Sequence, residues 1–361
     1  MRNSFWYLAG ALLVTGCADA ARPVDESGLA QAVTVSRVIP GLDLGSLGGP
    51  GASSQAGDIN NAGVVVGVSL NQAGLTRAFR WTRNGGMQDL GTLPGGTQSG
   101  ATRIVDDGQI LGWSDNAAGA RVPVRWNTAG RIEQLQLPWL SDTAYTHETA
   151  DFSQRGEVVG SATGEAMHGW YWSRATGMLD LRDQVPSCME NFAYAINAQG
   201  TVTGAACSGL GYPMAYTWNR ERGYQFLDIG EFPESVAFGL AISDAGTVGG
   251  FIDVRLAGQP APAIWPSGKG LVRLPNLPSR EPWGQVNGVN DRDIAVGYSR
   301  DSTGAWQPVA WPNARTLLLL ATAERQGGSA AAINNRRQVA GWGAGNGGAR
   351  HAMLWQLPGE R

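Results

Sequence analysis

The chain has 361 residues, of which 52 are glycine and only 16% are charged, and its formal net charge is −3. This length suffices for a large hydrophobic core, and the weakly negative charge excludes the basic surface that nucleic-acid binding needs. Frequent glycine, with many valine, isoleucine, threonine and tryptophan residues, indicates short strands joined by tight turns. We therefore expect an all-β protein without a nucleic-acid partner.

The first 17 residues predict an export signal. An apolar run from Phe5 to Val14 follows Arg2 and ends in "VTGC", which resembles the bacterial lipobox, so residues 1–17 are interpreted as a lipoprotein signal peptide with Cys17 as the lipidated residue. The alternative is an ordinary signal peptide cleaved near "CADA". Ala18 follows the cysteine, and by resemblance to enterobacterial sorting this implies the outer membrane. Residues 18–32 are expected to be a flexible tether.

Seven sequence units follow, each carrying three markers at constant spacing. The apolar markers are Ile59, Ile104, Phe152, Ile196, Ile242, Val289 and Ile333. A glycine stands eight residues after each of them: Gly67, Gly112, Gly160, Gly204, Gly250, Gly297 and Gly341. A tryptophan stands about 22 residues after each: Trp81, Trp126, Trp172, Trp218, Trp265, Trp311 and Trp355. Three markers in register over seven units establish an internal repeat.

Each unit predicts four short strands. In the first unit they fall at about 53–59, 64–69, 77–82 and 87–91, separated by the turn sequences "NNAG", "NQAG" and "RNGG". Four strands in about 46 residues are typical of a β-propeller blade. The tryptophan on the third strand is expected to fill the space between neighbouring blades. The prediction is a single seven-bladed β-propeller domain over residues 33–358.

The two ends of the repeat region predict how the ring closes. The last unit stops after "LWQLP" without a fourth strand, whereas the stretch "GLDLGSL" at residues 41–47 matches the fourth strand "MQDLGTL" at residues 87–93. We expect this N-terminal strand to complete the seventh blade and so to remove an open sheet edge.

The units resemble the HAF-type extracellular repeats of bacteria. The resemblance rests on "INNAGVVVG…TRAFRWTRNGGMQDLGTL" at 59–93 and "INNRRQVAG…RHAMLW" at 333–355, and it covers about residues 41–357. It implies a secreted or surface repeat protein, and it implies no catalytic residues. The second and third units depart from the pattern with "VDDGQILG" and "FSQRGEVVG", and "VNDRDIAVG" in the sixth lacks the turn glycine.

The repeated Asn/Asp pairs admit two readings. A ring of calcium sites would need several alternating oxygen ligands and an acid that binds through both oxygens, but here two adjacent positions are polar, as in Asn60-Asn61 and Asp106-Asp107. Asn and Asp also cap their own turns and tolerate left-handed backbone. We favour the turn role and expect no metal and no cofactor.

A binding face is expected on the loops that join each fourth strand to the next first strand, because these loops differ from unit to unit. The candidate residues there are Trp139, His147, Glu148, Glu190, Glu234, Arg280, Trp283 and Arg325. Trp139 and Trp283 stand out since they do not occupy the blade-tryptophan position, and exposed aromatic faces stack on sugars or partner surfaces. Cys188 and Cys207 flank one hairpin and are predicted to form a disulfide; two unreacted thiols are the alternative.

Catalytic motifs are sparse. The three histidines are His147, His168 and His351, and no HExxH, GxSxG or metal-type Cys/His cluster occurs in the sequence. The preferred hypothesis is a non-catalytic, monomeric, lipid-anchored scaffold that binds a protein or glycan at the cell envelope. The alternatives are a polysaccharide lyase or hydrolase with its site at the propeller axis, and a lectin with one site per blade. The dissimilar loops argue against the last.

Overall fold

The computed structural model describes residues 35–137, 146–163, 167–184, 190–207, 211–230, 235–254, 257–322, 327–345 and 348–359. They lie in one compact unit, residues 32–361. Apart from a three-residue 3-10 helix, η3 (Arg182–Gln184), the regular structure in these ranges is β-strand. Within the same ranges, no helix is long and apolar enough to cross a membrane.

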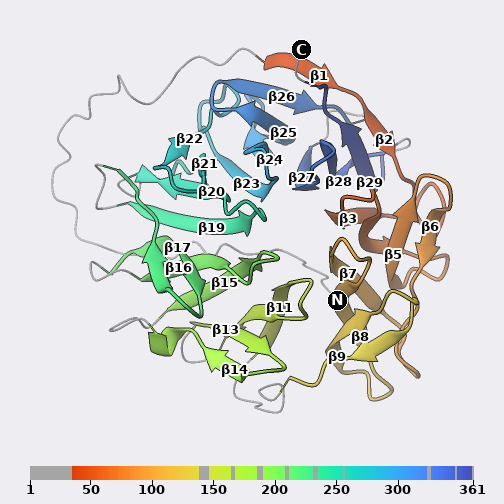
Figure 1. Cartoon of the computed structure of the whole chain (residues 1–361). Coiled ribbons are helices and arrows are strands. Elements are labelled where there is room, and N and C mark those ends of the chain that lie inside the picture. Colours follow the sequence, from red (N-terminus) through yellow and green to blue (C-terminus); the bar gives the residue numbers. More distant parts are fainter. Residues whose placement is uncertain are drawn as a thin grey trace. The chain divides into compact units, whose positions relative to one another are not determined.

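The strands form seven sheets arranged as the blades of a ring (Figure 1), and the four strands of each blade are antiparallel. Blade 1 comprises β3 (Ser54–Ile59), β4 (Val65–Leu70), β5 (Thr76–Thr82) and β6 (Gly86–Asp89), and blade 2 comprises β7 (Ser99–Ile104), β8 (Ile110–Asp115), β9 (Arg121–Trp126) and β10 (Ile132–Gln134). Blade 3 comprises β11 (Thr146–Phe152), β12 (Val158–Thr163), β13 (Met167–Ser173) and β14 (Gly177–Asp180). Blade 4 comprises β15 (Asn191–Ile196), β16 (Val202–Cys207), β17 (Pro213–Asn219) and β18 (Gly223–Phe226). Blade 5 comprises β19 (Val236–Ile242), β20 (Val248–Asp253), β21 (Ala261–Trp265) and β22 (Val272–Arg273). Blade 6 comprises β23 (Gly284–Val289), β24 (Ala295–Arg300), β25 (Trp306–Asn313) and β26 (Thr316–Leu320). Blade 7 comprises β27 (Gly328–Ile333), β28 (Gln338–Ala344), β29 (Arg350–Gln356) and β2 (Gly41–Asp43). The predicted seven-bladed propeller is therefore confirmed.

Two N-terminal strands, β1 (Val35–Ile39) and β2, close the ring by pairing with neighbouring blades. Strand β2 pairs with β29 and completes the seventh blade, with Leu42 opposite Leu354, so the predicted closure is confirmed over Gly41–Asp43. Strand β1 adds a parallel fifth strand to the sixth blade, next to β26. The sequence did not predict β1, because it has no counterpart in the repeat. The segment thus joins blades 6 and 7.

The hydrophobic core lies between the blades rather than within one central layer. Seven clusters of buried residues occur, and each joins two neighbouring blades. The cluster between blades 5 and 6, for example, packs Ile264 and Leu274 against Val309 and Trp311. The blade tryptophans thus fill the inter-blade space as expected, except that Trp172 is only half-buried and Trp170 is the buried tryptophan of blade 3.

The innermost strand of every blade carries a β-bulge just before the apolar marker. In blade 1 the register shifts between Ala56 and Asp58, and the same shift occurs in the other six blades. A bulge bends a strand and redirects its side chains. In blade 1 the residue immediately before the marker, Asp58, faces the propeller axis. Ala56, two positions before Asp58, is buried against a neighbouring blade.

The repeated asparagines cap turns and also connect blades. The Asn60 side-chain oxygen accepts from the backbone N–H groups of Ala62 and Val64, which is the predicted turn role. Its amide also donates to the carbonyl of Val105 in the next blade, at 3.3 Å. Asn197, Asn290 and Asn334 make the equivalent inter-blade bond, the last to Asn60 across the ring closure.

Candidate functional site

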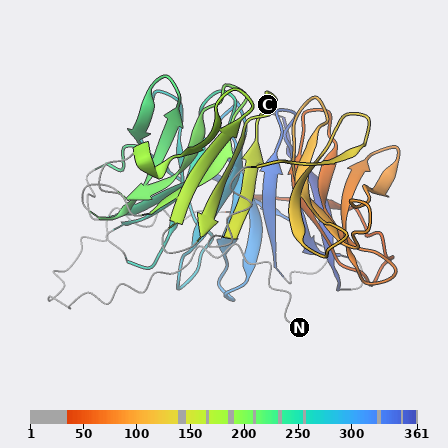
Figure 2. The same ribbon diagram turned by 90° about the horizontal axis from the view of Figure 1, so that it is seen from below.

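A cavity of about 200 Å³ lies on the propeller axis and is here called the axial cavity. It is lined by the last residues of the innermost strands and by the turns that follow them, so it lies at the turn end of the blades. The opposite end, where a fourth strand leads into the next blade, is called the loop end. Figure 2 shows the blades from the side, with strands running between the two ends.

The two sides of the axial cavity differ in chemistry. The residue before the apolar marker is charged in the first three blades: Asp58, Arg103 and Asp151. In the remaining four blades the same position holds a small residue: Ala195, Ala241, Gly288 and Ala332. The site is therefore charged on one side and small and weakly apolar on the other.

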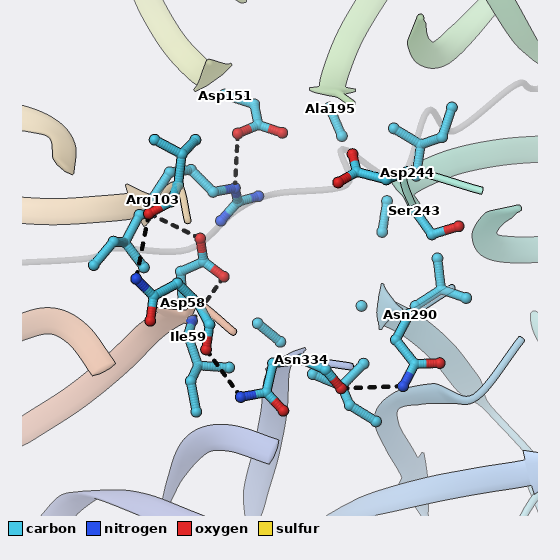
Figure 3. A pocket seen from close by; sticks show the side chains of 18 of the residues that line it. Asp58, Ile59, Arg103, Asp151, Ala195, Ser243, Asp244, Asn290 and Asn334 are labelled. Carbon is cyan, nitrogen blue, oxygen red and sulfur yellow. Dashed lines mark hydrogen bonds and ion pairs between the residues drawn. The ribbon is translucent and has the colours of Figure 1, made fainter. Parts of the chain in front are cut away.

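The three charged groups form one cluster. Figure 3 shows the Arg103 guanidinium between the carboxylates of Asp58 and Asp151. The Arg103 Nε atom lies 3.4 Å from Asp151 Oδ1. Arg103 also donates to the backbone carbonyl of Thr102, at 3.2 Å. Arg103 is thus ion-paired with Asp151 and lies near enough to Asp58 to act on its pKa.

Burial changes the acidity of both carboxyls. Desolvation raises the pKa of Asp58 from 3.8 to about 6, although Arg103 and two backbone N–H groups act in the opposite direction. Desolvation likewise raises the pKa of Asp151, again against the effect of Arg103. Each carboxyl is raised further by another negative charge, Asp151 acting on Asp58 and Asp244 acting on Asp151. One arginine does not compensate the negative charge buried here.

The same three residues also tie blades 1 to 4 together, including blades 1 and 2, which the Asn60 amide links as well. Asp58 accepts from the N–H of Ile104 in blade 2 at 2.9 Å, and Asp151 accepts from the N–H of Ile196 in blade 4 at 3.0 Å. The Arg103–Asp151 ion pair connects blades 2 and 3. Blades 2 and 3 are two of the units that depart from the Asn-Asn pattern. The charged cluster therefore has a structural role as well.

A polar rim surrounds the mouth of the axial cavity. Asp106 accepts from the backbone and side-chain N–H groups of Asn61 at 2.8 and 2.7 Å. Asp291 accepts from the side-chain amide of Asn335 at 2.6 Å and from the backbone N–H of Ala245 at 2.8 Å. Asp244 accepts from the backbone N–H of Ala198 at 2.8 Å. Five aspartates and one arginine line the cavity, so the lining is net acidic.

The loop end carries a different surface, a row of aromatic side chains across blades 4 to 6. Phe238 stacks on Phe251 with ring centroids 4.9 Å apart, and Trp283 stacks on Tyr298 at 5.5 Å. Trp283 also meets Trp306 edge to face at 4.9 Å. The row consists of Phe192, Tyr194, Phe238, Phe251, Trp283, Tyr298 and Trp306. All except Phe251 are half-buried.

The predicted candidates on the loop end are only partly described by the structure. Trp139, Glu234 and Arg325 lie outside the described residues, as do Cys17 and Cys188. His147 and Glu148 belong to β11, Glu190 forms an isolated bridge with Met167, and Arg280 is exposed. None of the described candidates lines the axial cavity. Cys207 is disulfide-bonded, while its predicted pairing with Cys188 stays a prediction.

Two histidines, His168 and His351, link neighbouring strands within a blade. His168 Nδ1 lies 2.8 Å from Asp180 Oδ2, and His351 Nδ1 lies 2.8 Å from Asp43 Oδ1. In each pair the histidine is on the third strand and the aspartate on the fourth. Arg77 and Asp89 form the same link in blade 1, at 3.0 Å. His168 and His351 thus have a structural role, because they link the third strand to the fourth strand of their blades.

Sequence reasoning missed the axial residues. The sequence does distinguish them: the position before the apolar marker holds a charged residue in three consecutive units and a small residue in the other four. The β-bulge turns the side chain at this position toward the propeller axis. The pattern of apolar and polar residues in the strand does not predict a bulge. Among the described residues, no group of three or more His, Cys, Asp or Glu side chains is placed to hold a metal ion.

Comparison with known proteins supports the fold. No protein-family model matches the chain, and no curated protein matches it. The β-propeller domain of the trilobed protease from Pyrococcus furiosus is similar, with a TM-score of 0.54 and 8% identity, over 85% of this chain and 96% of that one. BP39L lectin from Burkholderia pseudomallei has a TM-score of 0.47 and 10% identity, over 90% of this chain and 98% of that one.

TolB from Acinetobacter baumannii has a TM-score of 0.46 and 12% identity, over 82% of this chain. This chain spans 64% of the TolB structure, less than two thirds of its length. At 8% identity, the similarity to the trilobed-protease domain shows the fold and nothing finer. The chain is a seven-bladed β-propeller with four-stranded blades.

Proposed function

We propose that the protein is a non-catalytic, monomeric scaffold that binds a glycan at its loop end. The observation that carries this proposal is the aromatic row across blades 4 to 6, and in particular Trp283, which is half-buried between Tyr298 and Trp306. An aromatic side chain held rigidly by its neighbours loses little conformational entropy on binding. Its face offers the apolar surface on which the C–H side of a sugar ring packs.

Polar groups beside Trp283 suit the hydroxyls of a sugar. Arg300 donates to the Glu281 carboxylate at 2.6 Å, and its guanidinium lies 5.7 Å from the ring centroid of Trp306. The Arg300 backbone N–H donates to the carbonyl of Trp283. A rigid aromatic group with a few adjacent polar groups is the usual composition of a small-ligand site.

The test is a glycan and polysaccharide array probed with the chain from residue 33 onward. We expect specific binding that becomes about tenfold weaker in Trp283→Ala, since the substitution removes one aromatic contact. Phe226→Ala is the matched control, because Phe226 is 41% exposed on the outer strand of blade 4, and its removal should leave binding unchanged. Thermal melts of each variant check that the fold is retained.

Two other results would contradict this proposal. Binding to proteins of the cell envelope without any glycan signal would support a protein partner instead. Equal loss of binding in Trp283→Ala and Phe226→Ala would remove the loop end as the site.

A glycan-cleaving enzyme with its site at the axis is the second candidate. It is favoured by the two carboxyls of the axial cavity, one with a pKa raised to about 6, because a raised pKa suits a general acid. Against it, each carboxylate already accepts a backbone N–H on both oxygens. Chain cleavage of any bound polysaccharide that is lost in Asp58→Asn would establish this candidate in place of the first.

We also propose that the chain is exported and anchored by a lipid on Cys17, with the outer membrane as its destination. The lipobox-like "VTGC" sequence supports this proposal. Metabolic labelling of the full chain with an alkyne fatty acid is expected to label the wild type and not Cys17→Ser. Labelling of both proteins, or of neither, contradicts the anchor.

A further inference from the structure

The axial cavity holds more negative charge than its own residues neutralise. Asp58 and Asp151 are half-buried beside Arg103, the one basic side chain among the described lining residues, whereas Asp106, Asp244 and Asp291 at the rim are exposed to solvent. Charges in a desolvated site that lack a counter-ion are unfavourable, and the group then takes up a proton or a cation. Figure 3 shows the two half-buried carboxylates beside Arg103. Each oxygen of these two carboxylates accepts one backbone N–H and keeps a second lone pair for a ligand.

The shape of the cavity restricts which cation fits. Opposite the charged cluster, the wall consists of Ala195, Ala241, Gly288 and Ala332. This wall offers methyl groups and backbone to a ligand, which suits an aliphatic chain. The volume of about 200 Å³ corresponds to several water molecules of about 30 Å³ each. The described acidic side chains do not converge on a metal position.

We propose that the axial cavity binds the ammonium group of a small aliphatic amine beside the Arg103 guanidinium, on the cavity side of the Asp58 and Asp151 carboxylates, with the alkyl chain against the small residues of blades 4 to 7. The ligand supplies the second positive charge that Arg103 alone does not provide. The site lies at the end of the blades opposite the aromatic row and is independent of the glycan site.

Proton linkage gives this site a specific signature. Because the Asp58 carboxyl titrates at about 6 in the free protein, it is protonated at about pH 5 and ionised at about pH 7. The neighbouring groups on every facing element are Arg103, Asp151, Asp106, Asp244 and Asp291. An ammonium ligand displaces the proton, so its affinity rises with pH through this range. The expected gain between about pH 5 and about pH 7 is roughly tenfold, one proton being released per ligand.

The experiment is isothermal titration of the full chain with n-butylamine and putrescine in cacodylate, a buffer free of amines. 1-Butanol serves as the neutral control. A capped lysine, N-acetyl-lysine N-methylamide, tests whether the ammonium group of a side chain is accepted as well as that of a free amine. Binding of the amines and not of the alcohol, stronger at about pH 7 than at about pH 5, is the expected result.

Three variants locate the site. Asp58→Asn and Asp151→Asn each remove one carboxylate charge while keeping an acceptor oxygen, and they should weaken amine binding by about tenfold or more. Ala241→Leu keeps every charge and fills the alkyl side, and it should also weaken binding. Asp115→Asn, at the end of β8 on the loop end, is the matched control and should bind as the wild type does. Melting temperatures identify any variant that fails to fold, and the folded ones are compared.

The proposal is overturned by equal binding of butylamine and 1-butanol, by amine binding that is unchanged in folded Asp58→Asn, Asp151→Asn and Ala241→Leu, or by no binding of either amine at millimolar concentration. Tighter binding of CaCl2 than of either amine would assign the cavity to a metal ion instead.

Discussion

Replacing Gly250 by alanine is expected to destabilise the protein by about 3 kcal/mol or more, and the variant should accumulate mainly in the insoluble fraction on expression. A Cβ atom at Gly250 would lie 1.8 Å from the carbonyl oxygen of Phe238 and 3.3 Å from the Cα atom of Gly239. Both contacts are to backbone, so a rotamer change cannot relieve them. The innermost strand would have to move away from its neighbour, and the inter-blade cluster beside it would open.

Gly51→Ala is the matched control for this prediction. Nothing lies within 4 Å of a Cβ atom built at Gly51, and the position has no left-handed backbone. The same substitution there should change the free energy of unfolding by no more than about 1 kcal/mol, in the stabilising direction. Equal effects of the two substitutions in urea denaturation would contradict the steric argument.

This steric argument also explains the glycine marker of the repeat. In the other blades where the contact is described, a Cβ atom at the marker glycine would lie 1.8 to 2.2 Å from the carbonyl oxygen of the innermost strand. These glycines are Gly67, Gly112, Gly204, Gly297 and Gly341. The bulge in the innermost strand brings its backbone over the second strand at this point. The sequence showed that a glycine is required every unit, and the reason became clear only from the bulge.

Most of the fold could be predicted from the repeat, because four-stranded units of constant length leave few arrangements. The tryptophan positions, the blade count and the closure by β2 follow from markers that recur in every unit. Strand β1 could not be predicted, since it occurs once and its pairing with β26 depends on the ring already being closed. Likewise Asp293 and Arg337 take the left-handed turn position, with φ of 59° and 63°, where other units have glycine.

The candidate sites were harder to predict than the fold. The axial cluster combines Asp58, Arg103 and Asp151 from three blades, about 45 residues apart in sequence, and each looks like an ordinary strand residue in its own unit. For the loop end, the variable loops indicated Trp283 as a residue to examine, and its role in binding stays a prediction. Its packing between Tyr298 and Trp306 depends on neighbours from two other strands, which strand patterns do not reveal.

Removing the side chain of Trp311 is the other substitution with a large expected effect. Trp311 is fully buried between blades 5 and 6, and its indole N–H donates to the carbonyl of Pro275 in blade 5 at 2.8 Å. Trp311→Ala should lower the free energy of unfolding by about 4 kcal/mol, because it leaves a large cavity and an unpaired carbonyl. This is a large part of the 5–15 kcal/mol or so that stabilises a typical domain.

Two further variants separate the causes of that loss. Trp311→Phe keeps an aromatic ring but cannot donate to Pro275, and it should cost about 1–3 kcal/mol. Trp172→Ala removes the blade-3 tryptophan, which is only half-buried, and it should cost clearly less than Trp311→Ala because less apolar surface becomes exposed. In urea denaturation, we expect Trp311→Ala to lose the most free energy of unfolding. Trp311→Phe and Trp172→Ala should each lose less than Trp311→Ala. If Trp172→Ala costs as much as Trp311→Ala, burial between blades is not what the tryptophan marker contributes. The same indole-to-carbonyl bond occurs at Trp126, Trp265 and Trp355, so the result for Trp311 bears on three other blade interfaces of the ring.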